Sequence, residues 1–232
     1  MNIFAIIPAR GGSKGVPRKN VLDFDGIPLI AHSILQAKAV NEIVEVYVST
    51  DNDEIADISA KFGAKVIQRP ENISGDTATT ETAVSHAISE WDSQKLCPDA
   101  ILLLQATSPL RPDWGIAKAI QTFKEGHYDS LLSLSQTHRF FWSIDGDEAR
   151  AEYDYVNRPR RQDMTEKDIR YVENGSLYLF TRDHFLTHQN RLGGRIGSVV
   201  FPEEYAMEID SKTDFEILEH LSKNLKKRTN IK

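Results

Sequence analysis

Residues 3–20 read IFAIIPARGGSKGVPRKN, and this stretch decides the fold. Its first part, residues 3–7, is an unbroken apolar run, which is typical of a strand buried on both faces. Its second part, residues 8–20, combines glycines with basic residues and contains no acid. In open α/β sheets ligands bind beyond the carboxyl ends of the strands, and this loop follows such an end. The stretch therefore predicts an α/β fold that opens on a binding loop.

The rest of the chain alternates between short aliphatic runs and segments of helical period. Strands are predicted at 43–49, 65–69, 100–105, 129–135, 177–180 and 196–201. Helices are predicted from Pro28 and at 52–62, 80–91, 113–126, 182–189 and 211–224. Asp51 and Glu54 resemble a capping box for the second helix. Four strand–helix units predict a parallel sheet with right-handed crossovers, and residues 136–170, which break the rhythm, are interpreted as an insertion.

Length and composition indicate one globular domain. The chain has 232 residues, of which 40% are hydrophobic and 27% charged, so disordered, collagenous and coiled-coil classes are excluded. No apolar run approaches the ~20 residues of a membrane span, and the N-terminus lacks the pattern of a signal peptide, so we expect a cytoplasmic protein. The single cysteine, Cys97, excludes an internal disulfide and is expected to fill the core.

The charge distribution argues against nucleic acid as a partner. The net charge is −6, yet residues 221–232 hold five basic residues and no acid. The first 220 residues therefore carry 23 basic against 34 acidic residues, a net of −11. Such a body repels polyphosphate backbones at long range. The basic C-terminal segment is interpreted as a solvated end.

Residues 8–20 have the composition of a polyphosphate-binding loop. The glycines let backbone N–H groups approach a ligand, and four cations supply charge. These cations are Arg10, Lys14, Arg18 and Lys19. The loop matches neither the P-loop, whose Gly-Lys-Ser order is reversed here, nor the Gly-x-Gly-x-x-Gly dinucleotide spacing. A glycine-rich turn with solvated lysines is the alternative, but the length and single sign of the loop favour binding.

A second polar cluster follows the predicted strand at 100–105. The segment LLLQATSPLR, residues 102–111, ends this strand in Gln105, Thr107, Ser108 and Arg111. Gln105 closes a buried strand and needs a hydrogen-bond partner, so it is predicted to belong to the floor of a site. Thr107 and Ser108 could equally satisfy loop backbone.

Two carboxylates in MEID, Glu208 and Asp210, are two residues apart and face the same side if the segment is extended. Hard oxygen ligands in this arrangement suit Mg²⁺ bridging phosphates. Asp210 could instead cap the last helix, and without further context we favour the cap. None of the seven histidines shows ligand spacing, so none is assigned to a metal.

Further along the chain, NRPRRQD, residues 157–163, concentrates arginines whose guanidinium forks bind carboxylates and phosphates. A subunit contact is the alternative. In YVENGSLY, residues 171–178, an Asn-Gly turn precedes Tyr178, which could contact a ligand or pack in the core.

Taken in order, these motifs make the chain resemble the CMP-sialic acid synthetases (acylneuraminate cytidylyltransferases), which activate nine-carbon 2-keto sugar acids with CTP. The resemblance is carried by PARGGSKGVPRKN, VSTDNDEIA, QRPENISGDTATT, LLLQATSPLR, RPRRQD, YVENGSLY and MEID. It implies a three-layer, Rossmann-like α/β nucleotidyltransferase fold with a mostly parallel sheet over residues 1–232. It also implies a homodimer in which the insertion, residues 136–170, reaches into the partner's active site.

The resemblance also assigns roles to individual residues. It makes Arg10, Lys14 and Lys19 triphosphate contacts, which act in catalysis together with Asp210. It puts Asn20 near the ribose, and around the cytosine it puts Arg69, Ala78 and Thr80. The residues it implies for the sugar-acid pocket are Gln105, Arg160, Arg161, Gln162 and Tyr178, some of them supplied across the dimer interface. Asp210 matches the family's magnesium-binding aspartate, so a Mg²⁺ cofactor is expected, with Glu208 as its second ligand.

The chain departs from the family pattern at two points. Glu208 stands where Asp-Ile-Asp is commoner, and Val172 and Glu173 stand where several bacterial relatives have Arg-Pro. The implied reaction joins CMP from CTP to N-acetylneuraminate or a close relative and releases pyrophosphate. The alternatives are the same reaction on KDN, legionaminate or pseudaminate, and a non-catalytic nucleotide-binding protein.

Overall fold

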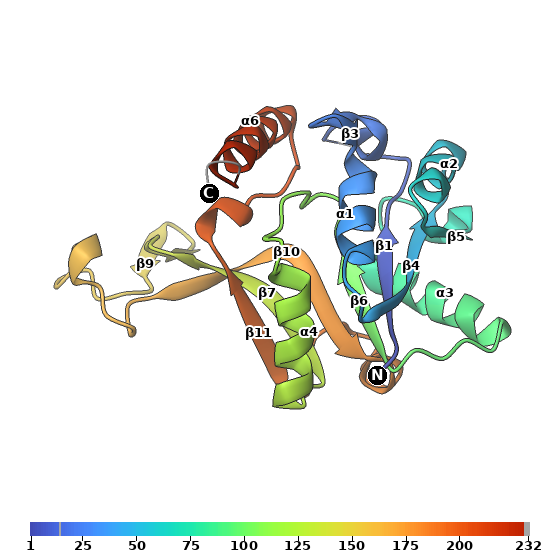
Figure 1. The fold of residues 1–232 in the computed structure, drawn as a ribbon. Coiled ribbons are helices and arrows are strands. Elements are labelled where there is room, and N and C mark those ends of the chain that lie inside the picture. Colours follow the sequence, from blue (N-terminus) through green and yellow to red (C-terminus); the bar gives the residue numbers. More distant parts are fainter. Residues whose placement is uncertain (14, 230–232) are drawn as a thin grey trace.

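In the computed structural model, seven strands form one sheet in the order β11-β7-β10-β6-β1-β4-β5, flanked by helices (Figure 1). The structure describes residues 1–13 and 15–229, the side chains of 226–229 excepted. The strands of this sheet are β1 (Ile3–Pro8), β4 (Ile43–Thr50), β5 (Lys65–Gln68), β6 (Ala100–Leu104), β7 (Ser130–Thr137), β10 (Arg170–Thr181) and β11 (Ile196–Phe201). β10 is antiparallel to both of its neighbours, whereas the other pairings are parallel, so the predicted α/β fold with a mostly parallel sheet is confirmed.

Helices cover both faces of the sheet, giving three layers. The α-helices are α1 (Leu29–Lys38), α2 (Asp53–Lys61), α3 (Thr80–Ser93), α4 (Gly115–Gly126), α5 (Arg182–His188) and α6 (Lys212–Thr229). The 3-10 turns are η1 (Lys19–Val21), η2 (Glu71–Ile73), η3 (Arg161–Asp163) and η4 (Glu203–Tyr205). Two small hairpins complete the elements, one of β2 (Asp23–Phe24) with β3 (Ile27–Pro28), the other of β8 (Trp142–Asp145) with β9 (Glu148–Ala151).

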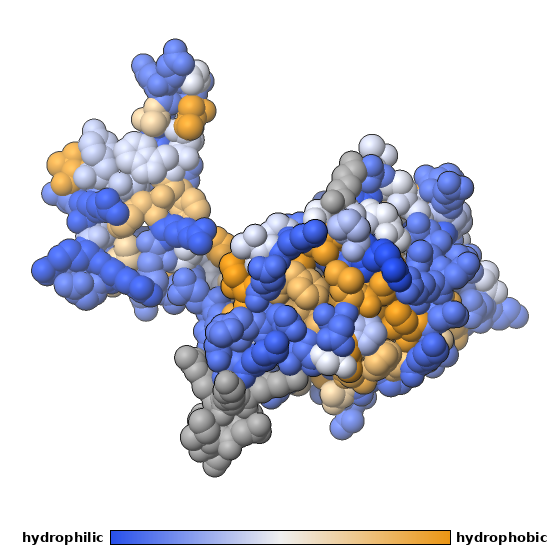
Figure 2. Space-filling model, turned by 90° about the horizontal axis from the view of Figure 1, so that it is seen from above, coloured by the Kyte–Doolittle hydropathy of each residue, from blue (hydrophilic) through white to orange (hydrophobic). Residues whose placement is uncertain are grey.

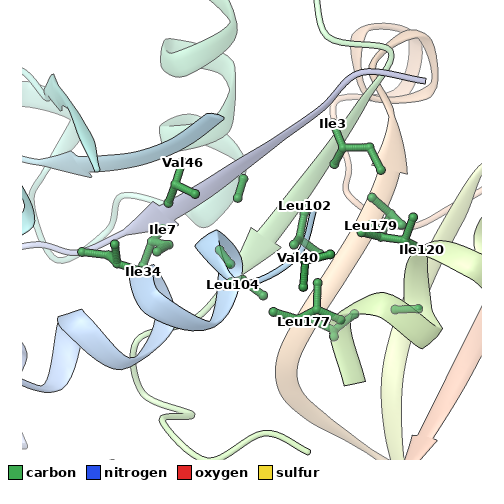
Figure 3. Close-up of a cluster of buried hydrophobic side chains, with 14 of the residues drawn as sticks. Ile3, Ile7, Ile34, Val40, Val46, Leu102, Leu104, Ile120, Leu177 and Leu179 are labelled. Atoms are coloured by element: carbon green, nitrogen blue, oxygen red, sulfur yellow. The ribbon is translucent and has the colours of Figure 1, made fainter. Parts of the chain in front are cut away.

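The hydrophobic core lies on both sides of β1 and β6, whose residues are almost all fully buried. On one side α1, α2 and α4 pack against alternate strand residues such as Ile7 and Leu102 (Figure 3). On the other side α3 and α5 pack against the intervening residues, such as Ile6 and Leu103. Burial on both faces explains why these strands have continuous apolar sequences.

Three predictions about local structure are wrong. Asn52, and not Asp51, caps α2, because its side chain accepts the N–H of Ile55 at 3.0 Å. Cys97 is exposed, since it lies in the surface loop between α3 and β6. The Asn-Gly pair at 174–175 makes no hairpin turn, because it lies inside β10, where the pairing with β7 is irregular between Glu173 and Tyr178.

Residues 138–169 leave the body between β7 and β10 and project from it, as Figures 1 and 2 show. We call this segment the arm. It contains the β8–β9 hairpin and η3, and its exposed side chains include Trp142, Ile144 and Val156. Figure 2 is seen from the side of the molecule toward which β1 runs, and it shows the arm standing apart from the body. No helix among the described residues is long and apolar enough to cross a membrane.

Candidate active site

A cleft of about 310 Å³ opens at the carboxyl ends of β1 and β6, two adjacent parallel strands. The chain continues from β1 to β4 on one side and later places β6 on the other, so the two following loops diverge and leave a crevice between them. The residues that line it are Pro8, Ala9, Arg10, Ser13, Gly15, Lys19, Asn20, Thr80, Gln105, Ala106, Thr107 and Asp210. The fold thus brings together residues from four distant parts of the sequence.

Lys19 contributes a buried cation to this cleft. Its Nζ donates a hydrogen bond to the carbonyl of Ile209, which fixes the ammonium beside the segment that carries Asp210. Burial lowers the pKa of Lys19 below that of an ordinary lysine, and the carboxylates of Asp210, Glu208 and Asp214 oppose this effect. Since the carboxylates favour the protonated form, Lys19 offers a positive charge to an anionic ligand.

The other cations of residues 8–20 have different surroundings. Arg10 lines the cleft and pairs with Asp76 at 3.1 Å. Arg18 points to α2 instead, where both carboxylate oxygens of Glu54 accept from its Nη2 at 2.6 and 2.8 Å. Lys14 lies outside the described residues. Of the described cations, Arg10 and Lys19 therefore form the positive wall of the cleft.

Side chains beneath the loop fix its path. Asn20 is buried and its Nδ2 donates to the carbonyl of Arg10 at 3.1 Å. Gly11 donates its N–H to Oδ1 of Asp51 at 3.0 Å. Asp51 is available for this bond because Asn52 caps α2 in its place. The loop is therefore tied both to itself and to the end of β4.

Two of the predicted cytosine-side residues, Ala78 and Thr80, lie around the start of α3, and the third, Arg69, follows β5. Thr80 lines the cleft at the first residue of α3, and Thr79 caps that helix. Ala78 lies two residues earlier and is not among the lining residues. Arg69 follows β5 and is buried; its Nη2 donates to the carbonyl of Ser49 at 3.2 Å, and burial lowers its pKa. Of the three predicted residues, only Thr80 lines the cleft.

The floor of the cleft is polar, and Gln105 and Thr107 line it. The hydroxyl of Thr107 lies 3.4 Å from Oε1 of Gln105 and 3.2 Å from Oε2 of Glu208. Thr107 thus contacts two side chains rather than loop backbone, which sequence reasoning left open. Burial raises the pKa of Glu208, and the charge of Asp210 adds to this effect.

Arg111 supports this floor from below. Its guanidinium is fully buried and donates to the carbonyls of Gln105 and Ser176, at 2.7 and 2.8 Å. It also donates to Ser33 Oγ and Gln36 Oε1 in α1. Burial lowers the pKa of Arg111 to about 9, so the group still carries its charge at neutral pH. One side chain thereby joins the end of β6, the irregular part of β10 and α1.

Tyr178 lies in the part of the core that α3 and α5 cover, and it is 2% exposed. Its hydroxyl donates to Glu173, and the guanidinium of Arg191 stacks 4.5 Å from the centre of its ring. Arg191 in turn pairs with Glu81 in the first turn of α3. Burial and the nearby Glu173 raise the pKa of Tyr178. Its predicted contact with a sugar acid remains a prediction, since Tyr178 does not line the cleft.

Asp210 does not cap α6, contrary to the interpretation favoured from its sequence alone. Ser211 and Asp214 cap the helix reciprocally, through N–H to Oγ at 3.2 Å and N–H to Oδ2 at 2.7 Å. The carboxylate of Asp210 is left to line the cleft. Residues 1–13 and 15–229 contain no group of three or more His, Cys, Asp or Glu that could hold a metal ion.

The remaining predicted residues, Arg160, Arg161 and Gln162, lie at η3 in the arm and are exposed. Arg160 pairs with Asp163 at 2.5 Å, within the same turn. None of the three lines the cleft of its own chain. Their predicted role in binding a sugar acid therefore depends on a second copy of the chain.

Sequence reasoning missed the partners of the site residues. Asp76, which pairs with Arg10, and Arg191, which stacks on Tyr178, carry no sequence signal for these roles. Ser13 and Gly15 lie in the predicted loop, and only the structure places them on the cleft wall.

Comparisons with known proteins agree with this geometry. The family model described as cytidylyltransferase matches residues 4–230. N-acylneuraminate cytidylyltransferase A of Danio rerio is 34% identical over 94% of this chain and 50% of its own. Pseudaminic acid cytidylyltransferase of Campylobacter jejuni is 32% identical over 96% of this chain and 97% of its own. The structure of CMP:2-keto-3-deoxy-manno-octonic acid synthetase complexed with CTP has the same fold, with a TM-score of 0.70, 18% identity and coverage of 97% and 99%.

The relatives differ in length. This chain spans about half the length of the vertebrate N-acylneuraminate cytidylyltransferases that it matches. It spans nearly all of the Campylobacter jejuni relative.

Proposed function

Because the chain belongs to the cytidylyltransferase family, we propose that it transfers CMP from CTP to a nine-carbon 2-keto sugar acid and releases pyrophosphate. The observation that carries this proposal is the cleft between the loops after β1 and β6. There Arg10 and Lys19 face Gln105, Thr107 and Asp210, so one wall suits phosphates and the floor suits a hydroxylated ligand.

In the proposed reaction the 2-hydroxyl oxygen of the sugar acid attacks the α-phosphorus of CTP. A new P–O bond forms, the bond to the pyrophosphate oxygen breaks, and the hydroxyl proton is released. Phosphoryl transfer leaves little covalent work to side chains, so the protein aligns the reactants and offsets charge. Arg10 and Lys19 would neutralise the departing pyrophosphate from the cleft wall. No side chain is assigned as a general base.

Mg²⁺ is part of the proposal, and the residues present fit it. Mg²⁺ is commonly bound by one or two carboxylates together with substrate phosphates, and Asp210 presents a carboxylate to the cleft. Glu208 fits less well as a second ligand, because its carboxylate is largely buried and contacts Thr107. The ion would supply Lewis-acid polarisation of the phosphoryl oxygens. Asp210 is therefore proposed as its main protein ligand.

N-acetylneuraminate or a close relative is the proposed acceptor. The likeness to the fish enzyme supports this choice. Pseudaminate is a second candidate, because the Campylobacter jejuni relative matches this chain over nearly its whole length at similar identity. Both are 2-keto acids of nine carbons, so the acceptor pocket must distinguish them by the rest of the sugar.

A homodimer is also proposed. The arm exposes large apolar side chains, including Ile144 at 78% and Val156 at 76%, which favours contact with another protein surface. Arg160, Arg161 and Gln162 lie on this arm, away from the cleft of their own chain. A partner's cleft is where the guanidinium groups of Arg160 and Arg161 and the amide of Gln162 could meet the carboxylate of a sugar acid.

The test is an assay of pyrophosphate release with Mg²⁺ and CTP against N-acetylneuraminate, KDN, legionaminate and pseudaminate, one at a time. We expect turnover with one acceptor well above the others, and little when ATP, GTP or UTP replaces CTP. Preference for pseudaminate would select the second candidate. Absence of turnover with every acceptor, in a protein that still binds CTP, would contradict the proposed activity.

A further inference from the structure

Arg10 is already engaged by the protein, although it lines the cleft. Its Nη1 donates to the carbonyl of Gly75 at 3.0 Å and to Oδ1 of Asp76 at 3.1 Å. Both acceptors lie between η2 and α3. The pair is partly exposed, with 33% of the Arg10 side chain and 54% of the Asp76 side chain accessible. A ligand can therefore reach both partners.

An anionic ligand in the cleft competes with Asp76 for this guanidinium. Nη1 carries two N–H groups and both are used, so a phosphate that reaches Nη1 must replace one acceptor. Phosphate oxygens match a guanidinium fork well, whereas exposed ion pairs are weak. The exchange therefore favours the ligand, at the cost of breaking the existing pair.

We propose that Asp76 is a displaceable partner of Arg10: it holds the guanidinium before the ligand binds, and a phosphate group then takes its place. This inference rests on the proposed function, because a triphosphate is the ligand that makes the exchange. Asp76 lies four residues before Thr80, which lines the cleft. Displacement therefore removes one of the two Arg10 hydrogen bonds to the segment that leads into the cleft wall, so triphosphate binding would loosen the hold of Arg10 on that segment.

Inorganic tripolyphosphate is the probe, because it presents the phosphates without base, ribose or chemistry. Asp76→Asn removes the negative charge and keeps the size of the side chain. We expect the variant to bind tripolyphosphate about two- to fivefold more tightly in isothermal titration, which is the range for loss of a weak exposed ion pair. Glu71→Gln is the matched control, because it removes one negative charge from the exposed face of nearby η2.

The Arg10→Ala background makes the test specific. If Asp76 acts through Arg10, Asp76→Asn has no further effect on binding there, and Glu71→Gln has little effect in either background. The inference is overturned if wild-type protein does not bind tripolyphosphate, or if Asp76→Asn binds it equally or more weakly. It is also overturned if the gain persists without Arg10. Thermal unfolding of each variant verifies that it is folded.

Failure of this inference is distinguishable from failure of the proposed function. Unchanged tripolyphosphate binding by Asp76→Asn, in a protein that converts CTP and a sugar acid to CMP-sugar, rejects only the exchange. Tighter binding by Asp76→Asn, in a protein that makes no CMP-sugar with any acceptor, rejects only the activity.

Discussion

The Cα of Gly15 packs directly against the main-chain carbonyl oxygen of Asp210, so that any Cβ at position 15 would collide with it. This contact joins the cationic loop to the segment that carries the proposed metal ligand. Gly15→Ala should therefore separate the two walls of the cleft. We expect kcat/KM to fall on the order of 100-fold, as for a misplacement of ~1 Å, and the melting temperature to fall as well, because the colliding atom belongs to the backbone. Gly12→Ala is the control, because within the described part of the chain no atom beyond its two chain neighbours lies within 4 Å of its Cβ position. Equal activities of the two variants would contradict this reading.

Lys19 and Asp210 should both be needed for turnover and not for folding. Removing a group that offsets developing charge reduces the rate by about 100-fold. We expect this loss in Lys19→Ala and in Asp210→Ala, measured as pyrophosphate release at saturating CTP. Circular dichroism should show wild-type secondary structure in both. Rates near wild type in both variants would reject the assignment of the cleft.

The pH dependence of kcat/KM should report the lowered pKa of Lys19. The charged form binds phosphate, and burial lowers the pKa, so the charge is lost at a lower pH than for an ordinary lysine. We expect the alkaline decline of kcat/KM to begin below the usual lysine pKa of 10.5. Lys19→Arg should move that decline to higher pH, because arginine stays protonated. An alkaline limb at the same pH in this variant would assign the titration to another group.

Arg111 should contribute strongly to stability. Arg111→Met leaves the buried carbonyls of Gln105 and Ser176 without their donor, and each unsatisfied buried acceptor costs about 1–3 kcal/mol. We expect the free energy of unfolding to fall by about 3 kcal/mol in urea titrations. Arg150→Met changes an exposed arginine of β9, for which about 0.5 kcal/mol or less is expected. A loss no larger at position 111 than at position 150 would contradict this account.

If the arm completes a partner's cleft, two impaired variants should complement one another. A mixed dimer of Asp210→Ala and Arg161→Ala chains contains one site with both residues intact. After the mixture is unfolded and refolded together, we expect about a quarter of wild-type activity, since half of the dimers are mixed and each has one complete site. Separate refolding of the two variants is the control. Recovery no greater than the mean of the separate samples would exclude sharing of the site.

Local patterns predicted most of the fold. The apolar runs of β1 and β6, and the buried face of α1 from Leu29 to Ala37, follow directly from strand and helix periodicity. The Asn174–Gly175 pair was misread because a hairpin turn and a strand irregularity both suit a glycine at positive φ, and Gly175 has φ of +62°. In the structure Ser133 of the neighbouring strand β7 donates its hydroxyl to Oδ1 of Asn174, a tertiary contact that the local pattern does not show.

The candidate site was predictable in part for the same reason. Residues 8–20 carry their charge and glycines within one loop, and Gln105 ends a recognisable strand, so both could be identified locally. The Arg10–Asp76 pair joins residues 66 positions apart, and the Tyr178–Arg191 contact depends on where α5 and its following loop return to the sheet. Tertiary packing determines such partners, and no local pattern in a single sequence indicates them.

β10 extends from the arm at Arg170 to Thr181 without a loop, and on the way Ser176 accepts two hydrogen bonds from Arg111 under the cleft. This twelve-residue strand therefore begins at the arm and also supports the floor of the cleft. If a partner subunit contacts the arm, as proposed, β10 connects that contact to the floor of the cleft at Ser176. The proposed dimer contact and the proposed reaction would in this way share one strand.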